Sequence, residues 1–182
     1  MSTIIQASSG SLTSIIRVNR PRFSDLWQNY IAGKSADEVY AIIGGKVQQL
    51  YNENPIGYSN TCAIRMSRSL NYGGMPINKN KIPSKAYHAK GGDGHSYFFR
   101  VKDIEKFLEL NFGKPELDIK TNGMNVSAQF RNKKGIIIFE VNFSDATGHV
   151  TLWEGAMCGD HCYFSSDNPE KIANRIKLWE LK

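Results

Sequence analysis

Two kinds of side chain in this sequence can carry out nucleophilic chemistry, namely three cysteines and four histidines. The cysteines divide into a single residue, Cys62, and a close pair, Cys158 and Cys162, which could close a small loop. A cysteine attacks in its thiolate form, and it needs a neighbouring base to accept its proton. A single cysteine together with a well-placed histidine therefore indicates an acyl-transfer enzyme as a first hypothesis.

Cys62 is expected in the first turn of a helix. Residues 61–70 place their apolar side chains on one helical face, and Asn60 or Thr61 is the expected N-cap. The free N–H groups and the dipole of a helix N-terminus favour a thiolate and can bind a developing oxyanion. The alternative is a small core residue between a helix and a sheet, since free cysteines are often buried.

His149 is the best-placed base among the four histidines. It begins a predicted strand directly after a glycine, whereas His88 and His95 lie in a polar loop and His161 lies between the paired cysteines. The alternative for His149 is a half-buried strand residue with no catalytic role. The chain order of cysteine, histidine and then an acid or amide is that of papain-type cysteine hydrolases.

Three residues could orient the histidine. These are Asp160, Asp145 and Asn142. We favour Asp160, because a bridge between Cys158 and Cys162 would hold a five-residue loop around it.

The elements that must position these residues are helices first and strands afterwards. Expected helices cover residues 21–33, with Phe23, Leu26, Trp27, Tyr30 and Ile31 on one face; residues 35–43, with Val39, Ile42 and Ile43 inward; residues 61–70; and residues 103–111. Expected strands cover residues 97–101, 135–143, 149–153 and 176–181, the middle two as an antiparallel pair. This order predicts an α+β fold in which N-terminal helices pack on an antiparallel sheet.

Length and composition indicate one ordinary globular domain. The chain has 182 residues, of which 41% are hydrophobic and 22% are charged. We expect a flexible, serine-rich lead-in over residues 1–18 and a single domain over residues 19–182. The first twenty residues lack the basic and apolar regions of a signal peptide, and no apolar run is long enough to span a membrane.

The net charge of 23 − 17 = +6 favours an anionic partner. One alternative is therefore a nucleic-acid-binding module without catalysis, built from the basic and aromatic residues of one region, Lys79, Lys81, Lys85, Lys90, Tyr87, Tyr97, Phe98 and Phe99. No known nucleic-acid motif supports it. A structural zinc site with Cys158, Cys162 and His161 or His149 is a second alternative, but it lacks another well-spaced ligand pair.

Three segments of the chain resemble the motifs of the type VI secretion amidase effectors of family 4. They are Asn60-Thr61-Cys62-Ala63-Ile64-Arg65-Met66-Ser67, Gly148-His149-Val150-Thr151-Leu152-Trp153 and Cys158-Gly159-Asp160-His161-Cys162. The segments Asn19-Arg20-Pro21-Arg22-Phe23 and Ile42-Ile43-Gly44-Gly45 are also similar to that family. The resemblance runs from about Asn19 to the C-terminus.

The resemblance implies an NlpC-like, papain-related fold and a peptidoglycan amidase. Such an enzyme cuts the peptide stem between D-glutamate and meso-diaminopimelate, with Cys62 as nucleophile, His149 as base, Asp160 as its orienting residue, and Cys158 bonded to Cys162. No metal or cofactor is implied. The implied partners are the peptidoglycan stem, the type VI secretion apparatus and an immunity protein that blocks the active site, and the implied place of action is the periplasm of a recipient bacterium. Neither nucleic-acid binding nor membrane insertion is implied.

Overall fold

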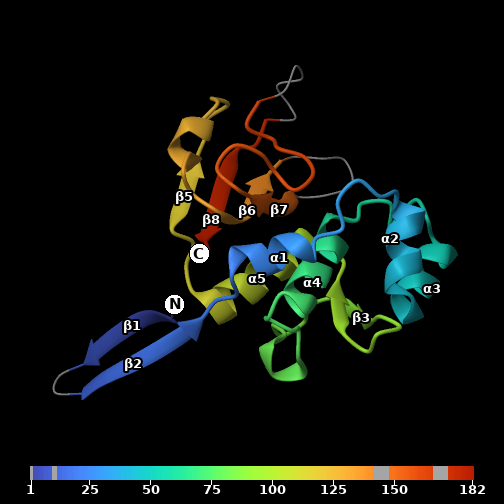
Figure 1. Ribbon diagram of the computed structural model, residues 1–182, viewed down its shortest axis with the longest axis horizontal. Helices are drawn as coiled ribbons and strands as arrows, with labels where there is room; N and C mark the ends of the chain where they lie inside the picture. The colour runs from blue at the N-terminus through green and yellow to red at the C-terminus, as the bar shows by residue number, and fades with distance from the viewer. Residues whose placement is uncertain (1, 10–11, 142–147, 166–171) are drawn as a thin grey trace.

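The structure is a computed structural model that describes residues 2–9, 12–141, 148–165 and 172–182. Its elements are, in chain order, β1 (Ser2–Ser9), β2 (Leu12–Asn19), α1 (Phe23–Gln28), α2 (Ala36–Ile43), α3 (Gly45–Glu53), α4 (Cys62–Tyr72), the 3₁₀ turn η1 (Lys79–Lys81), β3 (His88–Lys90), β4 (Ser96–Phe98), α5 (Val101–Phe112), β5 (Leu117–Lys120), the 3₁₀ turn η2 (Ser127–Phe130), β6 (Gly135–Glu140), β7 (His149–Trp153) and β8 (Arg175–Glu180). Figure 1 shows the four-stranded sheet beside a row of helices, with α2 and α3 at the far end of that row. The α+β prediction is confirmed.

An antiparallel sheet with the strand order β5-β8-β6-β7 forms one layer of the molecule. β7 pairs with β6, and Phe139 lies opposite His149, as the short connection predicts. Alternate residues of β7 pack into two different hydrophobic clusters, because successive side chains of a strand point to opposite faces of the sheet. Val150 and Leu152 pack with the helices, whereas Trp153 packs with Phe164 and Ala173 on the other face.

α4 is the central helix, and it is buried along nearly its whole length. It contacts α1, α5, β4 and the edge strand β7. Two of its buried hydroxyls have backbone partners: that of Ser67 donates to the carbonyl of Ala63 in the same helix, and that of Ser69 donates to the carbonyl of Leu26 in α1. Because buried polar groups without partners are destabilising, these bonds let a partly polar helix occupy the core.

The first helix is shorter than the sequence predicts. α1 ends at Gln28, because the side-chain amide of Asn29 bonds to the carbonyl of Asp25 at 2.8 Å and the backbone leaves the helical path. Tyr30 is buried and Ile31 is partly buried, but both lie in the segment that follows the helix.

The glycine pair at residues 44 and 45 joins two helices and does not simply end one. Ser35 caps α2 with a complete capping box, and Gly44 ends α2 and begins α3, a helix that the sequence reading missed. The prediction that Ile42 faces inward is wrong, since Val39, Tyr40 and Ile43 form the buried stripe and Ile42 is 48% exposed. The strand expected at residues 97–101 covers Ser96–Phe98, and α5 begins at Val101.

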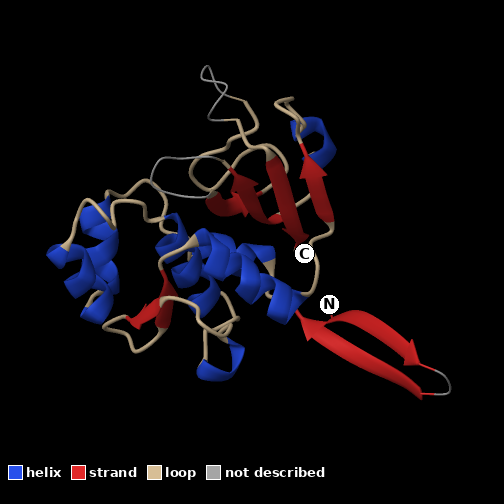
Figure 2. Cartoon of the chain, turned by 180° about the vertical axis from the view of Figure 1, so that it is seen from behind, coloured by secondary structure: helices blue, strands red, loops and turns tan. Residues whose placement is uncertain are grey.

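β1 and β2 form an antiparallel hairpin that extends away from the helices and the four-stranded sheet (Figures 1 and 2). The sequence reading expected a flexible lead-in over residues 1–18, and the structure shows two paired strands there. The division into a lead-in and a domain over residues 19–182 stays a prediction.

Candidate active site

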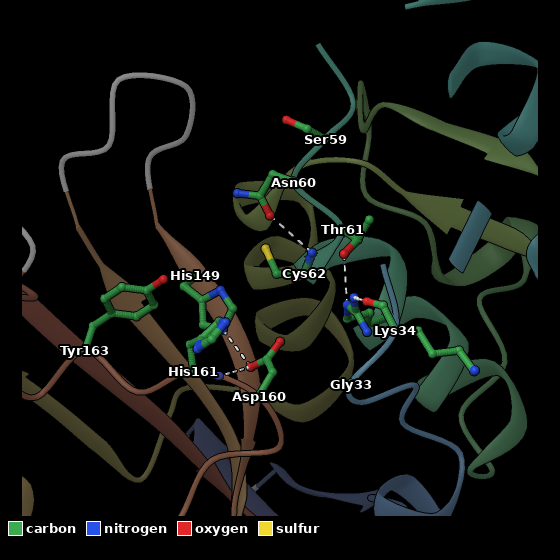
Figure 3. Close-up of a pocket in the computed structure, with 11 residues that line it drawn as sticks. Gly33, Lys34, Ser59, Asn60, Thr61, Cys62, His149, Asp160, His161 and Tyr163 are labelled. Atoms are coloured by element: carbon green, nitrogen blue, oxygen red, sulfur yellow. Dashed lines mark hydrogen bonds and ion pairs between the residues drawn. The ribbon is translucent and has the colours of Figure 1, made fainter. Parts of the chain in front are cut away.

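Cys62 is a free, buried cysteine at the first position of α4. Thr61 occupies the N-cap position but makes no side-chain cap, and instead the side-chain oxygen of Asn60 accepts the N–H of Cys62 at 3.2 Å. Figure 3 shows the sulfur and this hydrogen bond on the same side of the helix end. A polar N–H group and the thiol therefore lie together at a helix N-terminus, as the sequence predicts.

Arg65 fixes the chain around this helix end. Its Nε donates to the Thr61 hydroxyl at 2.8 Å, and its two terminal nitrogens donate to the carbonyls of Ile31 and Lys34. The side chain is itself buried, so its charge is compensated by carbonyl and hydroxyl dipoles. Arg65 thus holds residues 31–34 against the N-terminus of α4, where they form one wall of the site.

His149 lies across from Cys62 at the start of the edge strand β7 (Figure 3). It is only 6% exposed, and its ring stacks edge-on against Tyr163. Its Nε2 bonds to Oδ1 of Asp160 at 2.9 Å, and Cys62 lies near enough to contribute to its pKa. The structure therefore brings Cys62 together with His149 and Asp160, which lie far from it in the sequence.

The electrostatics favour a charged histidine between two acidic groups. Burial lowers the pKa of His149, but the hydrogen bond to Asp160 and the interactions with Cys62 and the Asp160 charge outweigh burial and raise this pKa to about 9. Burial raises the pKa of Asp160, but the hydrogen bond and charge of His149 have a larger, opposite effect. The pKa of this carboxyl therefore lies well below its usual range. His149 can therefore hold a proton near neutral pH and pass it to a departing group.

Asp160 lies in a short loop that is closed by the disulfide Cys158–Cys162, with a Cα–Cα distance of 5.6 Å. The loop is tied to β7 as well, because the N–H of Gly159 donates to the carbonyl of Leu152 at 2.8 Å. Within the loop, the N–H of His161 donates to Oδ1 of Asp160 at 2.6 Å. The disulfide and the backbone contacts together restrict the position of this carboxylate.

A pocket of about 590 Å³ surrounds these groups. Its lining comprises Gly33, Lys34, Ser59, Asn60, Thr61, Cys62, Arg65, His149, Asp160, His161 and Tyr163. His161 therefore lies at the pocket, whereas His88 and His95 are not among its lining residues. Asn142 and Asp145, the other candidates for the third residue, lie outside the described residues.

The sequence reading named Asn60 as a possible N-cap, but it missed two other contributors to this site. The role of Arg65 depends on hydrogen bonds to residues 31 and 34 that no local residue pattern indicates. Tyr30 was assigned to a helical face, yet its hydroxyl donates to Oδ2 of Asp160 at 2.8 Å. That contact joins residues 130 positions apart, so local periodicity could not indicate it.

The geometry argues against both alternatives from the sequence, a structural zinc site and a nucleic-acid-binding module. Cys158 and Cys162 are bonded to each other and so cannot serve as thiolate zinc ligands, and across the described residues no group of three or more potential ligands is suited to a metal ion. Tyr97 and Phe98 are fully buried and cannot stack on bases. Within the described part of the chain, no helix has the length and apolar character needed to cross a membrane.

Comparison with known proteins identifies the family. A family model described as type VI secretion system amidase effector protein 4, Tae4, matches residues 58–179. The Tae4 effector of Salmonella typhimurium, solved with the immunity protein Tai4 from Enterobacter cloacae, is 34% identical with a TM-score of 0.79, covering 90% of this chain and 100% of that one. Tae4 from Enterobacter cloacae, solved with Tai4, is 38% identical with a TM-score of 0.78 and the same coverage. Curated proteins gave no match. The fold is thus papain-like and NlpC-like, and the chain belongs to the Tae4 family of type VI secretion amidase effectors.

Proposed function

We propose that this chain hydrolyses the γ-D-glutamyl–meso-diaminopimelate amide bond of peptidoglycan stem peptides, with Cys62, His149 and Asp160 as its catalytic group. The observation that carries the proposal is that the buried thiol at the start of α4 lines one pocket with a histidine that is itself bonded to a carboxylate at 2.9 Å. Family membership supports an amidase reaction. A cysteine, a histidine and an oriented carboxylate form the set that cysteine hydrolases use for acyl transfer.

The reaction begins when the Cys62 thiolate attacks the amide carbon and forms a tetrahedral intermediate. His149, protonated, gives its proton to the diaminopimelate nitrogen as the C–N bond breaks, so that the leaving group departs as a neutral amine. Water, deprotonated by His149, then attacks the thioester; the C–S bond breaks, the D-glutamyl carboxylic acid leaves and ionises, and the Cys62 thiolate and protonated His149 are regenerated. Asp160 keeps the imidazole oriented throughout.

The oxyanion needs hydrogen-bond donors near the thiol. The N–H of Cys62 is in the right place, but it donates to Asn60 in this structure. We propose that the substrate oxygen replaces the side-chain oxygen of Asn60 at this N–H when the intermediate forms, since an oxyanion is the stronger acceptor.

The charge of the pocket suits an acidic peptide. Lys34 and His161 line it beside the catalytic group, and the whole chain carries a formal net charge of +6. Stem peptides are rich in carboxylates, so such a protein attracts them at long range.

The deciding experiment is mass spectrometry of peptidoglycan fragments after digestion. We expect the wild type to release stems cut between D-glutamate and diaminopimelate, Cys62→Ala and His149→Ala to release none, and Asp160→Asn to release them more slowly, because the nucleophile and its base act as a unit. The folded state of each variant is checked by circular dichroism. Turnover by Cys62→Ala at the wild-type rate, or cleavage of another bond, would refute the mechanism or the specificity.

The proposal extends to partners and place of action. The Tae4 effectors of Salmonella and Enterobacter are solved in complex with Tai4, and we propose that a cognate immunity protein covers the pocket of this chain as well. Such a complex should slow alkylation of Cys62.

We further propose that the chain acts in the recipient periplasm after type VI secretion. Expression with a periplasmic signal should then lyse cells, whereas cytoplasmic expression should be tolerated, and equal toxicity in both compartments would argue against it.

A further inference from the structure

The two oxygens of the Asp160 carboxylate have different partners. Oδ1 bonds to His149 at 2.9 Å and accepts the N–H of His161, whereas Oδ2 accepts the hydroxyl of Tyr30 at 2.8 Å. Building on the proposed catalytic group, we propose that Tyr30 is a positioning residue, which fixes the carboxylate of Asp160 so that Oδ1 faces His149.

Tyr30 is held firmly enough to do this. Its side chain is 9% exposed and packs in the cluster that contains Leu26 and Cys62. The segment just after it is anchored to α4, because Arg65 donates to the carbonyl of Ile31. Tyr30 therefore presents its hydroxyl from the helical layer, and Asp160 receives it from a loop attached to the sheet.

The loop is shaped to receive the ring of Tyr30. A Cβ at Gly159 would lie 3.0 Å from Cε1 of Tyr30 and 3.1 Å from Cδ1, closer than most Cβ contacts. A residue with a side chain at position 159 would thus push the ring or the loop away. The absence of a Cβ lets the tyrosine lie directly against the residue that precedes Asp160.

The charge states fit a fixed donor and a fixed acceptor. Burial and the charge of Asp160 raise the pKa of Tyr30 well above its usual value, so the phenol stays protonated and donates. The hydroxyl of Thr151 is buried beside the same carboxylate but has no partner at standard hydrogen-bond geometry. Tyr30 is therefore the side-chain hydroxyl with a well-formed bond to Oδ2.

Loss of this donor should affect the chemical step and leave substrate binding unchanged. Without it the carboxylate can rotate about its Cβ–Cγ bond, and the imidazole loses its fixed partner. Tyr30 is not among the residues that line the pocket. We therefore expect a lower kcat with little change in KM.

The test compares Tyr30→Phe with a matched control, Tyr51→Phe. Tyr51 is also buried, at 8% exposure, and its hydroxyl donates to a carboxylate, Asp37, at 2.7 Å, but neither residue lines the pocket. We expect Tyr30→Phe to lower kcat about tenfold, as loss of a hydrogen bond to a charged group does, and Tyr51→Phe to leave it unchanged. Equal kcat values for Tyr30→Phe and the wild type would overturn the proposal.

A double-mutant cycle separates positioning from general destabilisation. If Tyr30 acts through Asp160, then adding Tyr30→Phe to Asp160→Ala should lower kcat no further. The same fractional loss in both backgrounds would show that Tyr30 acts elsewhere and would overturn the proposal.

A measurement without substrate keeps the inference independent of the proposed reaction. The titration of His149, followed by NMR of its ring carbon-bound protons, should move to lower pH in Tyr30→Phe because the imidazolium loses a fixed counter-charge, and should not move in Tyr51→Phe. An unshifted titration in Tyr30→Phe would reject the positioning role. Absence of amidase activity in the wild type, by contrast, would reject only the proposed function.

Discussion

At the scale of single residues, the N–H of Cys62 donates to the side chain of Asn60, so in the proposed reaction an oxyanion must displace Asn60 from this N–H. We predict that Asn60→Asp lowers kcat/KM at least tenfold. A carboxylate holds the N–H more tightly than an amide does and repels both the thiolate and the oxyanion. The melting temperature should stay at or above the wild-type value, because aspartate accepts the same bond.

Asn54→Asp is the matched control for this substitution. Asn54 also accepts a backbone N–H, that of Gly57 at 3.0 Å, but it does not line the pocket. Its substitution by aspartate adds the same charge to the same loop. We expect it to retain wild-type steady-state kinetics. If Asn60→Asp also does so, the N–H of Cys62 is not an oxyanion donor.

The shifted pKa values of His149 and Asp160 predict how stability depends on pH. The pKa of His149 rises from 6.5 to about 9 on folding, so its contribution is fully present below about pH 6.5 and is lost as pH rises through 9. The pKa of Asp160 is lowered, so its contribution is present above pH 3.8 and is lost as pH falls further. The difference in melting temperature between the wild type and His149→Gln should therefore be largest near pH 5 to 6. A difference that does not change with pH would contradict this.

At the scale of elements, the close approach of two glycine-rich segments explains the Ile42-Ile43-Gly44-Gly45 motif. A Cβ at Gly45 would lie 2.4 Å from the nitrogen of Gly92 and 2.5 Å from the carbonyl carbon of Gly91. The N–H of Gly92 donates to the carbonyl of Ile43 at 2.9 Å, which fixes the two backbones together. The turn between α2 and α3 therefore packs directly on the loop before β4.

Gly45→Ala should destabilise the protein by about 3 kcal/mol or more, because the backbone must move to relieve the collision. Gly94→Ala separates this collision from backbone strain, since Gly94 has a similar φ of +78°, against +63° for Gly45, but nothing within 4 Å of its Cβ. We expect Gly94→Ala to lower the free energy of unfolding, measured with urea, by about 1 kcal/mol. Equal losses would mean that the positive φ alone is responsible.

The disulfide loop gives a second prediction at this scale. A bridge between residues four apart removes little chain entropy, so Cys158→Ser should change the melting temperature only slightly. Activity should fall several-fold, because the loop carries Asp160. Reductant should do the same to the wild type, and Cys62 should remain a free thiol. Three free thiols in the denatured, unreduced and air-exposed protein would show that the bridge does not form.

The elements that the sequence predicts well are those with strong periodic patterns. The helix after Cys62 and the pairing of β6 with β7 follow from such patterns, and they are the elements that carry the thiol and the histidine. α3 was missed because its glycines signal an end, while only tertiary contacts show that a new helix starts there. The bond of Tyr30 to Asp160 depends on a contact between the two layers, which no local pattern encodes.

At the scale of the whole molecule, Arg20 joins the segment before α1 to the end of the chain. Its guanidinium donates to the carbonyl of Phe112 at 2.7 Å, to the carbonyl of Glu180 at 3.0 Å and to the Glu116 carboxylate at 2.7 Å. The described core clusters contain residues from Phe23 to Leu181. These contacts stabilise the part of the chain that follows the hairpin.

We therefore predict that deletion of residues 1–18 leaves kcat and the melting temperature close to their wild-type values. Adding Arg20→Ala to the shortened chain should lower stability by about 2–3 kcal/mol, since a largely buried guanidinium and its partners at α5 and β8 lose their bonds. Thermal melts and stem-peptide hydrolysis measured on both chains provide the test. A marked loss of stability on deletion alone would make the hairpin part of the catalytic domain, and an unchanged melting temperature after Arg20→Ala would show that the anchor lies elsewhere.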